Sequence, residues 1–373
     1  MKRYLFFVLI ITLFSCSNDK IKFLSISNDQ VYGEYLQKAT TSDDNDQKLV
    51  YKYSQDFKEA YSYNFDFIRL PSQFLKSLSD NDKILSLNEH FSFDFFSDFF
   101  PIAMQAVTEN DKIWGIPDTI GDNRVIFYNK SLIDKIPANT DELTRLLQTS
   151  KDKEVFNFDI SDPENYIIWL YAFTGDKSRY IDFTNFRGEV VNSLDFYQFL
   201  TKGIIYYNYS ELRSRFSSGI LYSVIDNEAS YTYYKTNLGE NLGVSPLPIL
   251  SKNGIRASGR SIIYCYAIKK GVNKKKTSAI KNLIYRLSSD EFHKNMINYN
   301  KFSAKSTLPP RDVSSDGALT VIRSTLEDSV PRPDFEYLKN LTGALKIKLE
   351  ELSKNEKSSL TIYNELPEES AHF

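Results

Sequence analysis

The sequence predicts an α/β protein with more than one domain. Short apolar segments with the period of strands alternate with helical segments along most of the chain, and this alternation is typical of α/β folds. The chain has 373 residues, which exceeds the length at which a single hydrophobic core keeps growing. Two domains are therefore expected.

Apolar runs and turn residues define the expected elements in order. Asn28 and Asp29 are good helix N-caps after the first strand, and Thr140 is expected to cap a later helix. Residues 361–373 are expected to form a polar tail. Strands are expected at 21–27, 47–54, 64–70, 111–117, 123–129, 219–226 and 259–270, and a strand followed by a Pro-turn and a loop at 242–254. Helices are expected at 29–39, 140–150, 164–175 and 193–205, and a pair of helices at 274–300.

The first twenty residues indicate export and a lipid anchor. A basic start, "MKR", precedes an apolar run at 4–14 that is too short to span about 30 Å of hydrocarbon. "LFSC" resembles a bacterial lipobox, which implies a signal peptide at 1–15, cleavage before Cys16 and acylation of its sulfur. Residues 16–20 would form the lipidated tether, with the protein on the periplasmic side or the cell surface. An ordinary signal peptide that contains a cysteine is the alternative.

Charge and cysteine content exclude several classes of protein. Lys and Arg number 46 against 48 Asp and Glu, a net charge of −2, so neither nucleic acid nor an anionic membrane surface is expected as a partner. Cys265 lies in a strand-like run and has no second cysteine to pair with beyond Cys16. It is therefore expected to be a buried structural thiol, without a disulfide framework.

The sequence contains no recognisable catalytic or metal motif. The three histidines are far apart, and no GxSxG, Walker A or GxGxxG motif lies where a strand and a helix would support it. No enzyme activity, metal or cofactor is expected. Two carboxylates that hydrolyse a glycoside remain an alternative, although no spacing in the chain requires them.

The segment "GIPDTIGDNRVIFYNKSLI", residues 115–133, carries a family resemblance. It resembles the extracellular solute-binding proteins of ABC importers, of the maltose/oligosaccharide type (family 1). Further matching blocks follow the family's order: "FLSISNDQ", "NFDFIRLPSQF", "NFDISDPENYIIWLYAFTGD", "LGVSPLPILSKNGIRASGRSIIYCYAIKKG", "SAIKNLIYRLSSDEFHKNMI" and "SVPRPDFEYL".

The resemblance implies a two-lobe periplasmic-binding-protein fold (type II), each lobe a mixed sheet flanked by helices, joined by a multi-segment hinge. Lobe 1 would contain residues 21–121 and 260–307, and lobe 2 residues 122–259 and 308–360. "DTIGDN" would be the first crossing of the hinge, where Gly121 is expected to adopt dihedrals forbidden to a side chain. An ordinary Asp- and Gly-rich turn is the alternative.

The same resemblance nominates residues for a ligand cleft. Asp122 aligns with an acidic residue of the family's cleft. Arg124 lies in the strand that follows and is expected either to contact an anion or to pair with Asp122. Tyr337 is expected to replace a stacking tryptophan, because Trp114 and Trp169 lie where core packing is expected. The other candidates are Asn28, Asp29, Ser72, Gln73, Asp162, Tyr231, Tyr233 and Glu336.

The function implied is that of a membrane-anchored substrate-binding lipoprotein of an ABC importer. It would act as a monomer, close around a sugar, oligosaccharide or polyol phosphate, and deliver it to permease subunits. Convergence of two or three of the arginines near the cleft would indicate an anionic ligand; these are Arg69, Arg124, Arg256, Arg260, Arg311 and Arg332. The alternative is a lipoprotein that keeps the fold but has lost transport and binds an envelope or host partner.

Overall fold

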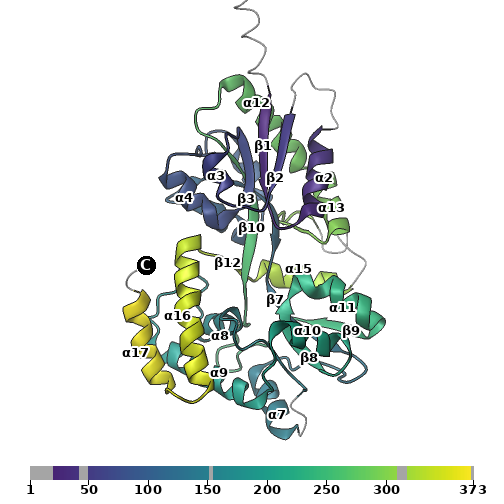
Figure 1. The fold of residues 1–373 in the computed structure, drawn as a ribbon, viewed down its shortest axis with the longest axis vertical. Coiled ribbons are helices and arrows are strands. Elements are labelled where there is room, and N and C mark those ends of the chain that lie inside the picture. The colour runs from purple at the N-terminus through teal and green to yellow at the C-terminus, as the bar shows by residue number, and fades with distance from the viewer. Residues whose placement is uncertain (1–19, 42–48, 151–153, 309–316, 371–373) are drawn as a thin grey trace, which may run out of the picture.

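The computed structural model describes residues 20–41, 49–150, 154–308 and 317–370 and has two lobes, one above the other along its longest axis (Figure 1). Cys16 and the expected signal peptide lie outside the described residues, as does Arg311. Within the described part, none of the helices combines the length and the apolar character needed to cross a membrane.

Lobe 1 is built on a mixed sheet. Its strands follow the order β11-β6-β10-β3-β1-β2, with β1 parallel to β2 and β3, and β10 antiparallel to β3 and β6. The short β12 (Val330–Pro331) pairs with the start of β10. The main strands are β1 (Ile21–Ile26), β2 (Leu49–Ser54), β3 (Phe67–Pro71), β6 (Ile116–Gly121), β10 (Arg260–Ile268) and β11 (Phe302–Ser303).

Helices cover both faces of this sheet (Figure 1), and side chains cap the N-termini of several of them. The Oδ1 of Asp29 accepts a hydrogen bond from the backbone N–H of Tyr32 at 3.0 Å at the start of α2. Asn273 and Ser289 cap α12 and α13 in the same way. The helices of lobe 1 are α2 (Gln30–Thr41), α3 (Glu59–Ser62), α4 (Leu75–Asp80), α5 (Phe93–Ser97), α6 (Pro101–Val107), α12 (Lys274–Leu287) and α13 (Asp290–Asn295).

Lobe 2 surrounds a smaller sheet in the order β8-β7-β9, formed by β7 (Arg124–Asn129), β8 (Ser223–Asn227) and β9 (Leu242–Ser245). Two isolated parallel bridges lie beside this sheet: Asn157 pairs with Val224 of β8, and Asn139 pairs with Ile249. Trp169 is fully buried in this lobe, as predicted for a core residue. The helices are α7 (Thr140–Thr149), α8 (Glu164–Thr174), α9 (Arg187–Gly203), α10 (Tyr209–Ser217), α11 (Tyr231–Leu238), α16 (Phe335–Ser353) and α17 (Ser359–Ser370).

Two expectations at chain and helix ends are wrong. The cap of α7 is Asn139, whose side chain accepts from the backbone N–H of Glu142 at 2.9 Å, and Thr140 is already helical. The expected polar tail is in fact mostly the helix α17. Ile362, Tyr363 and Leu366 of that helix are buried in the core of lobe 2, because their helical spacing places them on one face despite the polar composition.

The hinge segment also differs from its prediction. Strand β6 continues through Pro117 and Asp118 to Gly121, so the break in the strand is confined to Asp122 and Asn123. Gly121 does not have a positive φ; Asp122 does, at 67°. A Cβ at Gly121 would lie 2.9 Å from Oε1 of Glu228, so a larger residue there would require this carboxylate to shift.

Three segments of the described chain connect the lobes, and polar contacts join them. The first crossing is 121–124, the second is 246–261 and the third is 317–334. The side chain of Asn123 donates to the carbonyl of Thr325 in α15 (Gly317–Glu327) at 2.7 Å. The hydroxyls of Ser261 and Ser329 lie 2.6 Å apart. These contacts link the first crossing to the third and the second to the third, so the crossings are held together as a unit.

Candidate functional site

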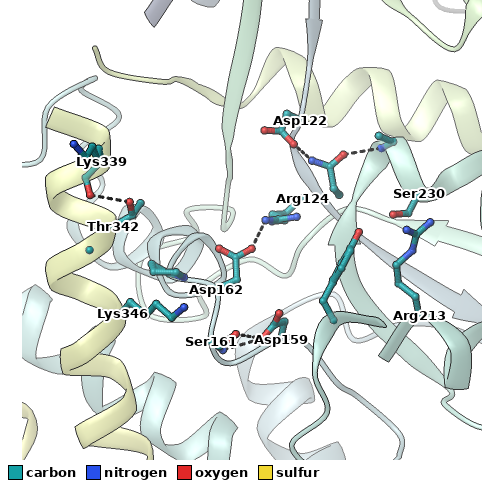
Figure 2. Close-up of a pocket in the computed structure, with 15 residues that line it drawn as sticks. Asp122, Arg124, Asp159, Ser161, Asp162, Arg213, Ser230, Lys339, Thr342 and Lys346 are labelled. Carbon is teal, nitrogen blue, oxygen red and sulfur yellow. Dashed lines mark hydrogen bonds and ion pairs between the residues drawn. The ribbon is translucent and has the colours of Figure 1, made fainter. Parts of the chain in front are cut away.

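A cavity of about 740 Å³ lies in lobe 2 beside the first hinge crossing (Figure 2). We call it the hinge cavity. Lys339, Thr342 and Lys346 of α16 form one wall, and Arg213 and Ser230 lie on the opposite side, with Asp162 and Arg124 between them (Figure 2). Its other lining residues are Asp122, Asp159, Ser161, Pro163, Tyr209, Asn227, Ala229 and Gly343.

Asp122 is held at the cavity edge by groups from separate segments. Arg332 of the third crossing forms an ion pair with its Oδ2, and the side-chain amide of Asn227, at the end of β8, donates to its Oδ1. Its backbone N–H donates to Oε1 of Glu228 at 2.5 Å. The position of Asp122 thus depends on both the hinge and the β8 end of lobe 2.

Arg124 and Asp162, both predicted as ligand residues, form an ion pair with each other through Nη2 and Oδ2. The Oδ1 of Asp162 accepts from the backbone N–H of Glu164 at 3.0 Å. Burial raises the pKa of Asp162, and Arg124 opposes this effect. The structure therefore brings Asp122, Arg124 and Asp162 into one cavity. Both carboxylates are already in ion pairs, Asp162 with Arg124 and Asp122 with Arg332.

Two buried carboxylates behind the cavity have opposite environments. Glu164 accepts from Nε and Nη2 of Arg260 at 3.1 and 2.8 Å. Burial alone would raise the pKa of Glu164, but Arg260 and Arg332 lower it to about 2. Glu228 has no cation that close; burial and the neighbouring Asp122 raise its pKa to about 8.

Three cations of the cavity, Arg213, Lys339 and Lys346, lack a carboxylate partner within the part of the chain that the structure describes. The guanidinium of Arg213 lies over the ring of Tyr233 at 4.3 Å and near that of Tyr209 at 5.5 Å. None of these three residues was predicted from the sequence as a ligand residue. Lys339 and Lys346 are seven residues apart on one helix, which places them on the same face, and this spacing was a usable signal.

The predicted residues of lobe 1 lie away from the hinge cavity. Asp29 forms an ion pair with Lys301 at 2.7 Å and caps α2, and Asn28 is exposed beside it. Ser72 and Gln73 line a separate space of about 10 Å³, which holds at most about one water molecule. Gln73 also lines a hollow of about 590 Å³ that it shares with Glu336. These four residues do not meet Asp122.

The predicted aromatic and late-loop residues are also distributed elsewhere. Tyr231 is buried in the core that contains α11. Tyr233 is exposed and contacts Arg213 without lining the cavity. The hydroxyl of Tyr337 donates to the carbonyl of Ile181 at 3.2 Å, and Glu336 is exposed in a different hollow beside lobe 1. The expected replacement of a stacking tryptophan by Tyr337 has no support in this arrangement.

Arginines converge at the hinge, but as ion pairs. Arg124, Arg260 and Arg332 are matched with Asp162, Glu164 and Asp122. Arg69 is buried in lobe 1, where its Nε donates to Asp118 at 2.5 Å, and Arg256 donates to a backbone carbonyl. The described residues contain no cluster of three His, Cys, Asp or Glu side chains that would suit a metal ion. Cys265 is buried, and burial raises the pKa of its thiol.

The lobes also touch away from the crossings. Arg179, in the loop after α8, forms an ion pair with Glu109 of lobe 1 at 3.1 Å. Its guanidinium also donates to the carbonyls of Gln105 and Ala106, at the C-terminus of α6, at 2.9 and 2.5 Å. A cation at the C-terminal end of a helix interacts favourably with the helix dipole. Arg179 therefore contributes to the relative placement of the two lobes.

A family model described as bacterial extracellular solute-binding protein matches residues 40–320. The chain belongs to this family. A search of curated proteins finds no match. The family assignment confirms the resemblance read from the 115–133 segment, and the solute-binding proteins of this family are extracellular.

Solved structures share the fold. A cyclo/maltodextrin-binding protein with maltotetraose has a TM-score of 0.81 at 16% identity, covering 95% of this chain and 97% of its own. An extracellular solute-binding protein from Staphylococcus aureus with maltose has 0.80 at 15% identity, covering 95% and 98%. The maltose-binding MalE of Listeria monocytogenes has 0.76 at 18% identity, covering 95% and 97%. These likenesses confirm the two-lobe fold.

Proposed function

We propose that this protein captures a sugar, oligosaccharide or polyol phosphate in the hinge cavity and delivers it to the permease of an ABC importer. The observation that carries the proposal is the position of Asp122. It contributes to a ligand-sized cavity and is paired with Arg332 of another hinge crossing. A ligand that binds beside Asp122 therefore acts directly on the segments that set the angle between the lobes.

The chemistry of capture follows from the side chains. Each carboxylate oxygen has two lone pairs, so Asp122 and Asp162 can accept ligand hydroxyls while keeping their cations. Closure requires that the ligand bind the closed arrangement more tightly than the open one. The contact of Arg179 with α6 is of the kind that would re-form on each closure.

The test is a thermal-shift screen of the full chain, purified in detergent, against neutral sugars, acidic sugars and polyol phosphates. A ligand at 100 times its Kd stabilises the folded state by about 2.7 kcal/mol. We expect a hit that is lost in Asp122→Asn and kept in the control Glu189→Gln, an exposed carboxylate on α9. No hit from any class would contradict capture and favour the alternative, a lipoprotein that binds an envelope or host protein.

The proposal includes a lipid anchor on Cys16 and export to the outer face of the membrane. Its support is the lipobox-like sequence and the extracellular family. Cys16→Ala removes the sulfur that would carry the acyl chains, and stable anchoring needs more than one such chain. The variant is therefore expected to move from the membrane fraction to the soluble fraction of cells. An unchanged membrane fraction would argue against lipidation at this residue.

A further inference from the structure

We propose that the ligand of the hinge cavity is a linear acidic oligosaccharide, with carboxylate or sulfate groups, and that it extends along α16. This inference deepens the proposed function and rests on it. Three observations carry it: the charge left over after ion pairing, the contact of one arginine with two aromatic rings, and a second cavity that continues from the first.

The first observation is the balance of unpaired charge. Asp122 and Asp162 are neutralised by Arg332 and Arg124. Asp159 is then the one lining carboxylate without a cation, within the described residues, and Ser161 occupies its Oδ1 through N–H and hydroxyl. Arg213, Lys339 and Lys346 outnumber this one carboxylate, so the cavity attracts anions.

The second observation concerns Arg213, which is held in place before any ligand arrives. The rings of Tyr233 and Tyr209 contact its guanidinium. Its Nε is buried and has no hydrogen-bond acceptor among the described residues. A guanidinium that is oriented by aromatic rings and has no carboxylate partner among the described residues favours a carboxylate or sulfate oxygen. The exposed ring of Tyr209 offers an apolar face to a sugar.

The third observation is a groove of about 580 Å³ that shares Ser161 and Lys346 with the hinge cavity. We call it the α16 groove; it is lined by Ile160, Ser161, Thr201, Ile204, Tyr206, Lys346, Glu350, Ser353 and Lys354. Tyr206 is 57% exposed there. Since each cavity alone is within the usual size for a ligand, the pair suits a chain of sugars with Lys346 between its units.

The experiment measures affinity by isothermal titration calorimetry on the full chain in detergent. The probes are the galacturonate trimer, the galacturonate monomer, maltotriose and a sulfate ester of maltotriose. We expect both acidic trisaccharides to bind at least tenfold more tightly than maltotriose at low salt, and the monomer to bind more weakly than the trimer. The difference from maltotriose should shrink in 0.5 M salt, where screening shortens the range of exposed charges.

Variants assign the effect to residues. Lys346→Gln is expected to weaken the trimer about tenfold, equal to about 1.4 kcal/mol. Lys252→Gln, an exposed lysine of lobe 2 that lines neither cavity, is expected to leave it within twofold. Asp159→Asn is expected to strengthen it, since the amide keeps the Oδ1 acceptor but removes the opposing charge. Tyr206→Ala should weaken the trimer and leave the monomer unchanged.

The outcomes separate this inference from the proposed function. Tighter binding of either acidic trisaccharide, lost in Lys346→Gln, supports it and shows which acidic group is preferred. Maltotriose binding as well as or better than both acidic trisaccharides overturns it and leaves solute capture intact. Equal affinity of monomer and trimer overturns the extended site. Binding of none of the four probes overturns the acidic oligosaccharide as ligand, and capture itself then depends on the wider screen.

Discussion

The ion pair between Glu164 and Arg260 is expected to contribute strongly to the stability of lobe 2. Its carboxylate has a pKa of about 2 in the folded chain, against an ordinary value of 4.5. One pKa unit corresponds to about 1.36 kcal/mol, so the ionised carboxylate contributes about 3 kcal/mol to folding at pH 7. Breaking one partner of a buried pair costs a similar amount, about 3–5 kcal/mol.

The perturbation is Glu164→Gln, measured by urea unfolding with fluorescence of Trp169, which lies on the same helix and is fully buried. We expect a loss of about 3 kcal/mol at pH 7. Because the folded pKa is depressed, this contribution is complete above pH 4.5 and declines below it. At pH 3.5 the gap between wild type and variant should therefore have narrowed by about 1.4 kcal/mol.

The matched control is Glu189→Gln, an exposed carboxylate on α9, which should change stability by less than about 0.5 kcal/mol. Equal urea midpoints for wild type and Glu164→Gln at pH 7 would refute the reasoning. A gap that stays constant between pH 7 and pH 3.5 would show that the loss comes from packing and not from charge.

Three further predictions follow from buried contacts. Leu366→Ala in α17 should cost about 2–5 kcal/mol in urea unfolding, while Leu360→Ala, exposed on the same helix, should be nearly neutral; equal effects would contradict the packing of α17. Glu228→Gln should gain stability relative to wild type between pH 5.5 and pH 8, because the raised pKa of Glu228 makes its ionisation unfavourable in the folded state. Urea midpoints at these two pH values test this, and a variant that loses stability relative to wild type at pH 8 would contradict it. Arg179→Ala should increase the radius of gyration in small-angle X-ray scattering without ligand; no increase would assign lobe placement to the hinge alone.

Much of the fold was readable because local signals agreed with the global one. The strands of lobe 1 are short, apolar and bounded by turn residues, and the family segment at 115–133 located the first crossing. The helix α17 was missed because four of its residues are acidic or amide side chains around a three-residue apolar face. Composition obscured a periodicity that was present.

The site was harder to predict because it depends on pairing. Asp122, Arg124 and Asp162 were all predicted as ligand-binding residues, and the structure places them along one cavity. No sequence rule shows that Arg124 would be matched with Asp162, or that Arg213 would remain unmatched, since these contacts join residues far apart in the chain. Charge type is visible in a sequence, whereas charge left unbalanced is a property of the fold.

The place of β10 in the sheet has a consequence for biogenesis. This strand lies between β3 and β6, both of which precede it by more than a hundred residues. A ribosome adds about 5–20 residues per second, so β6 waits roughly 7–30 s for its neighbour. Throughout that interval, the first half of lobe 1 has open strand edges that invite aggregation. The order of strands thus delays completion of lobe 1 until late in synthesis, after most of lobe 2 has already been made.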